Sequence, residues 1–287
     1  MARPKTDAAL LLLFGGLSLA AVGLGALVCH ASGVPQGLWL RNLAAWALGA
    51  AAAGGLAATW RPAWTPAFLW VAPIGLALTF LGGGQEGVHR WLALGPLQVN
   101  AAMLLLPAAV VAGGALAARG ELAWVGLLVP LALLAAQPDA SQATALAAAT
   151  VLIAATAPGR PWVRGTTALA AIGLAALAWL RPDPLQPVPE VEGVFQLAWS
   201  LSPLAGGAAL LLLLAASLSP ALAVHGAPAG RLPGRALGLC LCVWAAAPFL
   251  GAFPVPLVGM GMSPILGTWL GVGLLAALTR LSPQAQG

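Results

Sequence analysis

Residues 181–196 read RPDPLQPVPEVEGVFQ and interrupt a chain that is otherwise strongly apolar. Four prolines and three acidic residues fall within this stretch, and long apolar segments flank it on both sides. Prolines at this density break any continuous helix, because each fixes its own φ angle and lacks a backbone N–H. We therefore predict an extended, exposed loop between two helices. If the protein carries out chemistry with carboxylates, this loop is the place for it.

The composition around the loop is that of an integral membrane protein. Hydrophobic residues make up 61% of the 287-residue chain and charged residues only 7%, whereas about a quarter of the residues in a soluble domain are charged. The apolar blocks suit helices that cross a hydrocarbon core of about 30 Å, and they lack the alternation of barrel strands. The sequence therefore predicts an all-α, polytopic membrane bundle. We expect one domain over residues 1–287, with an outer Pro-rich acidic loop at 181–196.

Ten membrane spans are predicted, with glycine and proline turn signals in the breaks between them. Their expected ranges are 8–29, 38–59, 64–81, 98–118, 121–136, 141–157, 164–180, 197–224, 234–252 and 262–280. An even number of spans places both termini on one side of the membrane. The loop at 181–196 then lies on the opposite side.

Basic residues distinguish the two sides, because Lys and Arg concentrate in the cytoplasmic loops of membrane proteins. With the N-terminus inside, only Arg41, Arg90 and Arg181 fall outside. The other basic residues fall inside: Arg3, Lys5, Arg61, Arg119, Arg160, Arg164, Arg231, Arg235 and Arg280. Both termini are therefore expected to be cytoplasmic. No basic cluster is longer than two residues, so membrane lipid is an expected partner and nucleic acid is not.

Three signatures lie at the outer ends of the spans. Residues 87–95 read GVHRWLALG, residues 134–139 read LAAQPD and residues 254–266 read PVPLVGMGMSPIL. In this order and at these positions they resemble the SEDS family, which contains the FtsW, RodA and SpoVE proteins of cell division and cell shape. That family has a G-x-x-RW-x-x-LG stretch, a QPD after a span, and a P-x-P-F-x-S-Y-G-G-S segment that enters the last helix.

The resemblance implies a multi-pass protein of the bacterial cytoplasmic (inner) membrane that takes part in peptidoglycan synthesis. Proteins of this family polymerise a lipid-linked disaccharide and work with a penicillin-binding transpeptidase, within the divisome or the elongasome. Arg90, Trp91, Asp139 and Ser263 become candidate substrate-binding residues. For Asp139 we favour a structural role, because a carboxylate that follows Pro138 can cap the next helix. No metal site and no cofactor are predicted.

The chain departs from the family where the chemistry is expected. The family's outer-loop carboxylate is an aspartate within a P-E-x-H-x-D-F pattern. Glu190 and Phe195 match this pattern, but Glu192 stands at the histidine position and Val194 at the aspartate position. A short, degenerate member of the family is therefore indicated.

A second departure lies at the head of the span over 98–118. The family has a glutamate and a lysine there, and this chain has Met103 and Leu106. Ionisable groups inside a membrane are costly and usually functional. Their replacement removes polar groups from the expected cavity.

These observations lead to three hypotheses. The leading one is a degenerate SEDS-like protein that binds a lipid-linked precursor or partner proteins. The alternative is an active glycosyltransferase in which Glu190 or Glu192 takes the proton from the attacking sugar hydroxyl. Against that alternative, we favour the interpretation that these two acids form a solvated face of the loop. A third hypothesis, a lipid or solute transporter, conflicts with the near absence of ionisable residues in the spans.

Overall fold

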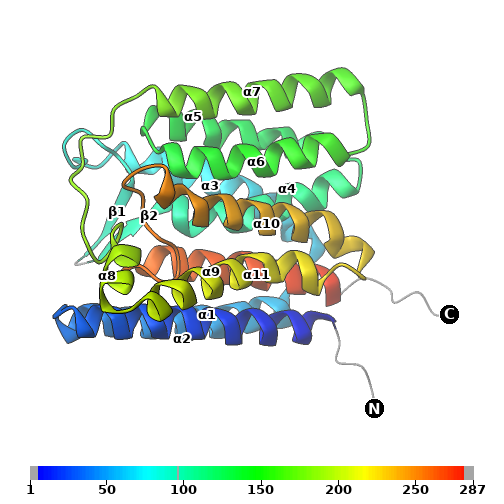
Figure 1. Cartoon of the computed structure of the whole chain (residues 1–287). Helices are drawn as coiled ribbons and strands as arrows, with labels where there is room; N and C mark the ends of the chain where they lie inside the picture. The colour runs from blue at the N-terminus through cyan, green and yellow to red at the C-terminus, as the bar shows by residue number, and fades with distance from the viewer. Residues whose placement is uncertain (1–5, 96, 281–287) are drawn as a thin grey trace, which may run out of the picture.

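The computed structural model describes residues 6–95 and 97–280 as a bundle of long helices lying side by side (Figure 1). The long helices are α1 (Thr6–Ala31), α2 (Gln36–Thr59), α3 (Thr65–Thr79), α4 (Ala101–Ala118), α6 (Ala140–Thr156), α7 (Pro161–Trp179), α9 (Pro203–Ala223), α10 (Pro228–Ala246) and α11 (Met262–Arg280). Shorter helices are α5 (Leu128–Ala136), α8 (Val194–Leu201) and the 3₁₀ turns η1 (Pro62–Trp64), η2 (Leu122–Leu127) and η3 (Ala247–Phe249). Strands β1 (Trp91–Leu94) and β2 (Leu97–Asn100) form an antiparallel hairpin at one end of the bundle.

Each of the ten predicted ranges overlaps at least one of these helices. By length and composition, seven helices in the described residues can cross a membrane, and Leu122–Ala136 and Ala140–Thr156 are shorter apolar helices. The long helices lie along one axis, and helices that follow one another in the chain, with α5 counted between α4 and α6, run in opposite directions (Figure 1). The prediction of an all-α, polytopic membrane bundle is confirmed, and the protein is an integral membrane protein.

Two predicted boundaries are wrong for local reasons. The range 197–224 is not one helix, because Ser202 has an extended backbone (φ −168°, ψ 151°) that separates α8 from α9. Pro203 follows it, and a residue before proline is disfavoured in the helical region. The range 98–118 begins as strand, and α4 starts only after Asn100. The Asn100 side chain accepts a 3.0 Å hydrogen bond from the Met103 N–H, which caps the helix.

Helices α4 and α11 form the centre of the bundle, since 83% of the apolar window of each is buried. Small residues allow their backbones to approach closely, as is usual between membrane helices. A Cβ atom added to Gly267 would lie 2.0 Å from the Met103 carbonyl oxygen. This glycine therefore fixes how closely α11 packs on α4.

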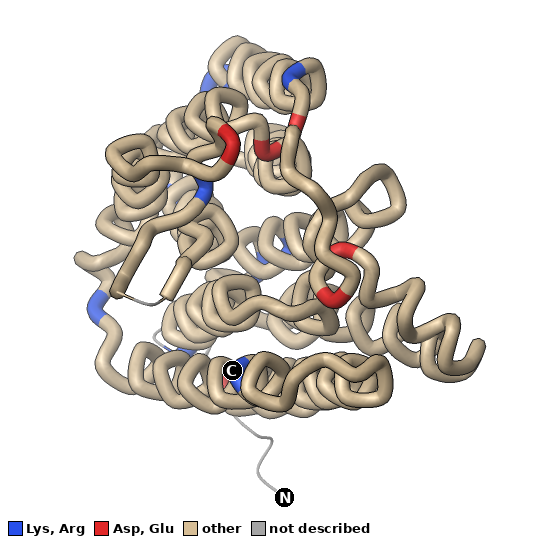
Figure 2. Tube along the Cα trace, turned by 90° about the vertical axis from the view of Figure 1, so that its left-hand side faces the viewer, with Lys and Arg blue, Asp and Glu red and all other residues tan. Residues whose placement is uncertain are grey.

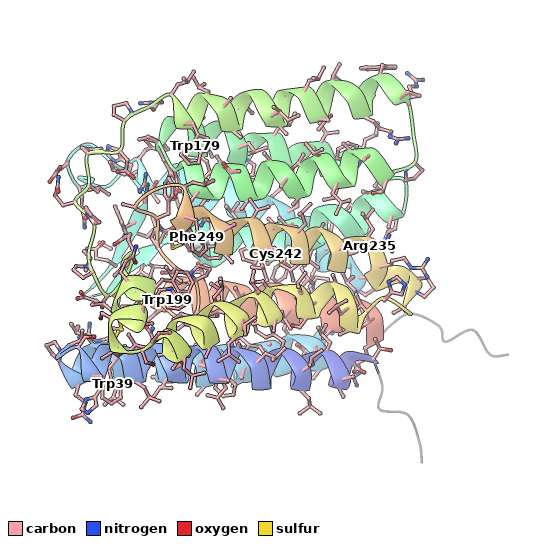
Figure 3. All side chains as sticks on the ribbon, in the orientation of Figure 1. Trp39, Trp179, Trp199, Arg235, Cys242 and Phe249 are labelled. Atoms are coloured by element: carbon pink, nitrogen blue, oxygen red, sulfur yellow. The ribbon has the colours of Figure 1, made fainter. Side chains whose placement is uncertain are left out.

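The two ends of the bundle differ in charge. Figure 2 looks onto the hairpin end, here called the outer end, and shows acidic positions gathered in its loops. In Figure 3, Trp39, Trp179 and Trp199 lie toward the outer end, whereas Arg235 lies at the opposite end, where α9 joins α10. Arg3 and Lys5, which the sequence placed inside, are outside the described residues.

Candidate functional site

The outer end brings together segments that are far apart in the sequence. They are the hairpin with its preceding loop, the turn between α5 and α6, the Pro-rich loop, and residues 247–261 between α10 and α11 (Figure 1). Three of these segments carry the signatures found in the sequence. The candidate site is therefore built from loops held by the ends of rigid helices.

Arg90 is the charged centre of this end. Its side chain is only 9% exposed. One terminal nitrogen, Nη2, donates to Asp183 Oδ2 at 2.7 Å and also to the Pro138 carbonyl oxygen. Its Nε lies 3.7 Å from Asp139 Oδ2, close enough for an ion pair but too far for a hydrogen bond. Arg90 thus ties the hairpin to the α5–α6 turn and to the Pro-rich loop.

Asp139 is held more tightly than Asp183. Its Oδ1 accepts from the Gln142 N–H at 3.2 Å and from the Ser141 hydroxyl at 3.1 Å. The prediction that Asp139 caps the N-terminus of the following helix, α6, is therefore confirmed. The Asp139 side chain is 3% exposed and that of Asp183 is 27% exposed. A role for Arg90 or Asp139 in substrate binding stays a prediction.

A second set of buried hydrogen bonds, centred on Gln137 and Thr79, holds the backbone next to Arg90. Gln137 Nε2 donates to the Thr79 hydroxyl at 2.6 Å and to the Leu76 carbonyl at 3.1 Å. Thr79 in turn donates to the His89 carbonyl at 2.7 Å. These bonds connect the end of α3, the residue before Arg90 and the α5–α6 turn, so the position of Arg90 is fixed by its neighbours. Buried polar groups with such partners are strongly orienting.

The segment at 254–263 is held from two helices. Asn42 on α2 donates to the Gly259 carbonyl at 2.9 Å and accepts from the Gly261 N–H at 3.1 Å. Ser263 at the start of α11 accepts from the Asn100 backbone N–H at 3.0 Å. Asn100 is the register partner of Trp91 across the hairpin, so Trp91 and Ser263 are linked through β2.

The Pro-rich loop has two differently held halves. Its second half is bound by backbone hydrogen bonds from Val255 N to Val191 O at 3.1 Å and from Met260 N to Glu190 O at 2.8 Å. Residues 182–188 have no regular structure, as predicted, but Glu190 and Glu192 lie in a turn just before α8. The prediction of an extended loop is thus correct for its first half only.

Glu192 lines a cavity of about 490 Å³ on the outer surface. The cavity lies between the Pro-rich loop with α8 and the segment after α10, and Glu192 is the charged residue in its lining. Burial raises the pKa of the Glu192 carboxyl, and the nearby charges of Asp183 and Glu190 act in the same direction. A 2.7 Å hydrogen bond from the Val188 N–H opposes this shift. Arg90 is engaged elsewhere, so the structure does not bring the candidate base and the candidate cation together.

The positions that depart from the family pattern are apolar and buried. Val194, at the start of α8, is 0% exposed, Met103 is 5% exposed and Leu106 is 2% exposed. All three belong to the hydrophobic core. At these three positions the chain has packed apolar side chains and no ionisable group.

Sequence reasoning missed two residues of this end. Asp183 was noted only as one acid of the loop, and nothing in its local sequence indicates Arg90 as its partner. Asn42 was not noted at all, although a lone amide beside Arg41 in an apolar span is a signal that could have found it. Polar side chains inside a membrane usually find partners.

Comparison with known proteins places the fold. No protein-family model matches the chain, and no curated protein matches it. Solved structures do match, and they place the chain in a class of helical membrane-protein folds. The fold is that of the rod shape determining protein RodA of Thermus thermophilus, with a TM-score of 0.68, 23% identity, and coverage of 94% of this chain and 97% of that chain.

Two further structures match. An aspartate-to-alanine variant of the same RodA matches with a TM-score of 0.67 at 23% identity. A peptidoglycan synthase complex that coordinates polymerization and crosslinking contains a chain that matches with a TM-score of 0.60 at 24% identity. That match covers 93% of this chain and 96% of the other. The predicted likeness is confirmed at the level of the fold.

Proposed function

We propose that the protein is a SEDS-like component of bacterial cell-wall assembly in the cytoplasmic membrane. In this proposal it binds a lipid-linked peptidoglycan precursor or a partner protein and does not itself polymerise glycan rapidly. The RodA fold, the matching outer signatures and the many bonds that hold those signatures in place support it.

The observation that carries the proposal is the burial of Val194. Glycosyl transfer needs a base within about 2.6–3.2 Å of the attacking hydroxyl. The side chain at the family's aspartate position has no proton acceptor and is 0% exposed within the core. Arg90, the cation that would stabilise a departing pyrophosphate, is paired with Asp139 and Asp183 in this structure.

A second candidate is an active glycosyltransferase that uses Glu192, with Glu190 beside it. The specific observation in its favour is that Glu192 lines an open cavity and has a raised pKa, a combination typical of acid–base groups. Polymerisation by this route requires Glu192 to reach a substrate whose pyrophosphate is bound away from Arg90.

The proposed partner is a penicillin-binding transpeptidase of the divisome or elongasome. The match to a chain of a peptidoglycan synthase complex supports this choice. Exposed apolar side chains at the outer end include Trp199 (49%), Phe249 (61%) and Leu250 (67%), which offer contact area to lipid or to a partner helix.

Polymerisation of lipid-linked disaccharide by the purified protein tests the proposal. The protein is assayed in lipid nanodiscs, alone and with a transpeptidase, beside a Glu190→Gln/Glu192→Gln double variant. We expect binding of the precursor without glycan strands from either chain. Glycan strands from the wild type that disappear in the double variant would establish the second candidate instead.

Glu86→Gln is the matched control for this experiment. It also removes an acid from the outer end, but Glu86 lies in the exposed turn before β1 and does not line the Glu192 cavity. Loss of strands in the control as well would show that net charge, and not the loop, determines activity. If the protein neither makes glycan strands nor binds the precursor, the precursor-binding part of the proposal is contradicted. Binding of a partner protein is then the part of the proposal that remains.

A further inference from the structure

The Asp183 carboxylate has an unusual position in the outer end. It binds the same nitrogen of Arg90, Nη2, that donates to the Pro138 carbonyl. The other acid of the cluster, Asp139, is fixed by the cap of α6 and is almost fully buried. Asp183 comes from a loop and is 27% exposed. Of the two anions around Arg90, Asp183 is therefore the one that can leave.

The loop around Asp183 depends on this contact. In the described chain, every hydrogen bond of residues 182–187 involves the Asp183 carboxylate. Its Oδ2 accepts from Arg90, and its Oδ1 accepts from the Leu185 N–H at 3.2 Å. The second half of the loop is held independently by backbone bonds to Val255 and Met260. Release of Asp183 therefore frees one half of the loop and leaves Glu190 and Glu192 in place.

The charges favour exchange of Asp183 for another anion. One guanidinium faces two carboxylates, and Arg90 Nε has no hydrogen-bond partner in the described residues. A guanidinium presents several donors in one plane and binds phosphate oxygens in pairs. A phosphoryl group that replaces Asp183 keeps the number of anions around Arg90 unchanged and adds acceptors for its unused donors.

We infer that Asp183 occupies the place of a phosphoryl group on Arg90, and that residues 182–187 form a lid that this group displaces. The ligand class is a lipid-linked diphosphate, so the inference rests on the proposed precursor binding and extends it. The lid makes binding weaker than Arg90 alone would allow, because the ligand competes with an internal carboxylate. Loss of this partly buried competing ion pair is expected to tighten binding about five-fold, which corresponds to about 1 kcal/mol.

Asp183→Asn tests the competition. The full chain is placed in phosphatidylcholine nanodiscs, and the dissociation constant of a polyprenyl diphosphate is measured. We expect about five-fold tighter binding by Asp183→Asn, the change that corresponds to loss of a competing ion pair. Glu86→Gln, which removes an outer acid that does not contact Arg90, is expected to bind like the wild type.

Labelling of the loop gives an independent readout. Leu185→Cys is introduced after replacement of Cys29, Cys240 and Cys242 by alanine, and its rate of reaction with a membrane-impermeant maleimide is measured. With Asp183 present, the diphosphate should raise the rate. With Asp183→Asn, the rate should be high without ligand. The first comparison keeps Asp183, so it tests the lid even if Asp183→Asn lowers the folded yield.

The outcomes separate the lid from the proposed function. Wild-type binding that Asp183→Asn leaves unchanged or weakens would overturn the lid and leave precursor binding intact. No binding by either chain would contradict precursor binding, and the lid with it. Nanodiscs of phosphatidylglycerol are the remaining arm: if they alone raise the labelling rate, the site takes an ordinary phospholipid headgroup, and the assignment to a diphosphate is wrong.

Discussion

The side chain of Asn42 holds the carbonyl of Gly259 at 2.9 Å, although 217 positions separate the two residues. The same amide accepts from the Gly261 N–H, so one side chain satisfies two backbone groups of the segment before α11. Asn42 is 2% exposed. A buried backbone group without a partner costs about 1–3 kcal/mol. The two hydrogen bonds of Asn42 therefore stabilise the segment before α11 at the outer end of the protein.

Asn42→Ala is expected to destabilise the protein by about 2–4 kcal/mol, because it leaves the Gly259 carbonyl and the Gly261 N–H unpaired. Thermal unfolding of the detergent-solubilised protein measures the loss. Gln98→Ala is the control, since Gln98 is an exposed amide at the same end of the molecule. Equal stability of Asn42→Ala and the wild type would show that other groups replace this amide.

Gly267→Val is expected to prevent folding or to destabilise the protein by about 3 kcal/mol or more. A Cβ at this position meets the Met103 carbonyl at 2.0 Å and the Leu104 carbonyl at 2.8 Å, and helix backbones cannot move apart without loss of packing. The measurement is the monodisperse yield in size-exclusion chromatography. Gly16→Ala is the control, because nothing lies within 4 Å of its added Cβ; its yield should match the wild type.

Arg90→Gln is expected to destabilise the protein by about 3 kcal/mol, because it leaves the buried Asp139 carboxylate without its counter-charge. Arg90→Lys should recover part of this loss, since an ammonium supplies the charge but cannot match the geometry of the guanidinium. Chemical unfolding in mild detergent gives the comparison. Arg41→Gln is the control, because Arg41 is exposed and has no carboxylate within 4 Å among the described residues. A loss as large in the control would rule out the buried ion pair as the cause.

The raised pKa of the Glu192 carboxyl predicts that the stability of the protein depends on pH. Burial raises its pKa in the folded protein above the ordinary value of 4.5, so the folded state binds its proton more tightly than the unfolded state does. This contribution to stability is present below the ordinary pKa and is lost as the pH rises through the raised pKa. Glu192→Gln keeps an oxygen to accept from Val188 and cannot ionise.

We therefore expect the stability of Glu192→Gln to fall less than that of the wild type as the pH rises above 4.5. Unfolding midpoints measured over a pH series check this. Glu86→Gln controls for the loss of one negative charge. A wild-type profile that coincides with that of Glu192→Gln would contradict a buried, proton-binding Glu192.

Much of the architecture could be predicted from local sequence. Long apolar blocks must be helical in a membrane, because no water satisfies their backbone groups there. The positions of the helices follow from this requirement and from the glycine and proline breaks. The places where a predicted helix is broken or begins late were less predictable. The extended backbone at Ser202 and the hairpin before α4 each depend on a cap or a strand partner as well as on local preference.

The site could be predicted only in its location. The outer signatures do meet at one end, and Asp139 caps α6 as expected. The sequence did not indicate that Arg90 binds Asp183, that Glu192 lines a cavity away from Arg90, or that Asn42 holds the segment before α11. Those pairs join residues from different loops, and the pairing of charges across loops depends on distances that no local pattern contains.

The sequence by itself determined a membrane bundle with its charges sorted to two ends, because hydrophobicity and positive charge act on each segment separately. The tertiary structure decided which charges neutralise each other. Asp183 and Asp139 lie 44 positions apart in the chain, and both reach Arg90 only because the ends of α3, α5 and α7 open onto the same outer surface. Whether a buried arginine can bind a ligand depends on such partners, and only the packing of the helices determines them.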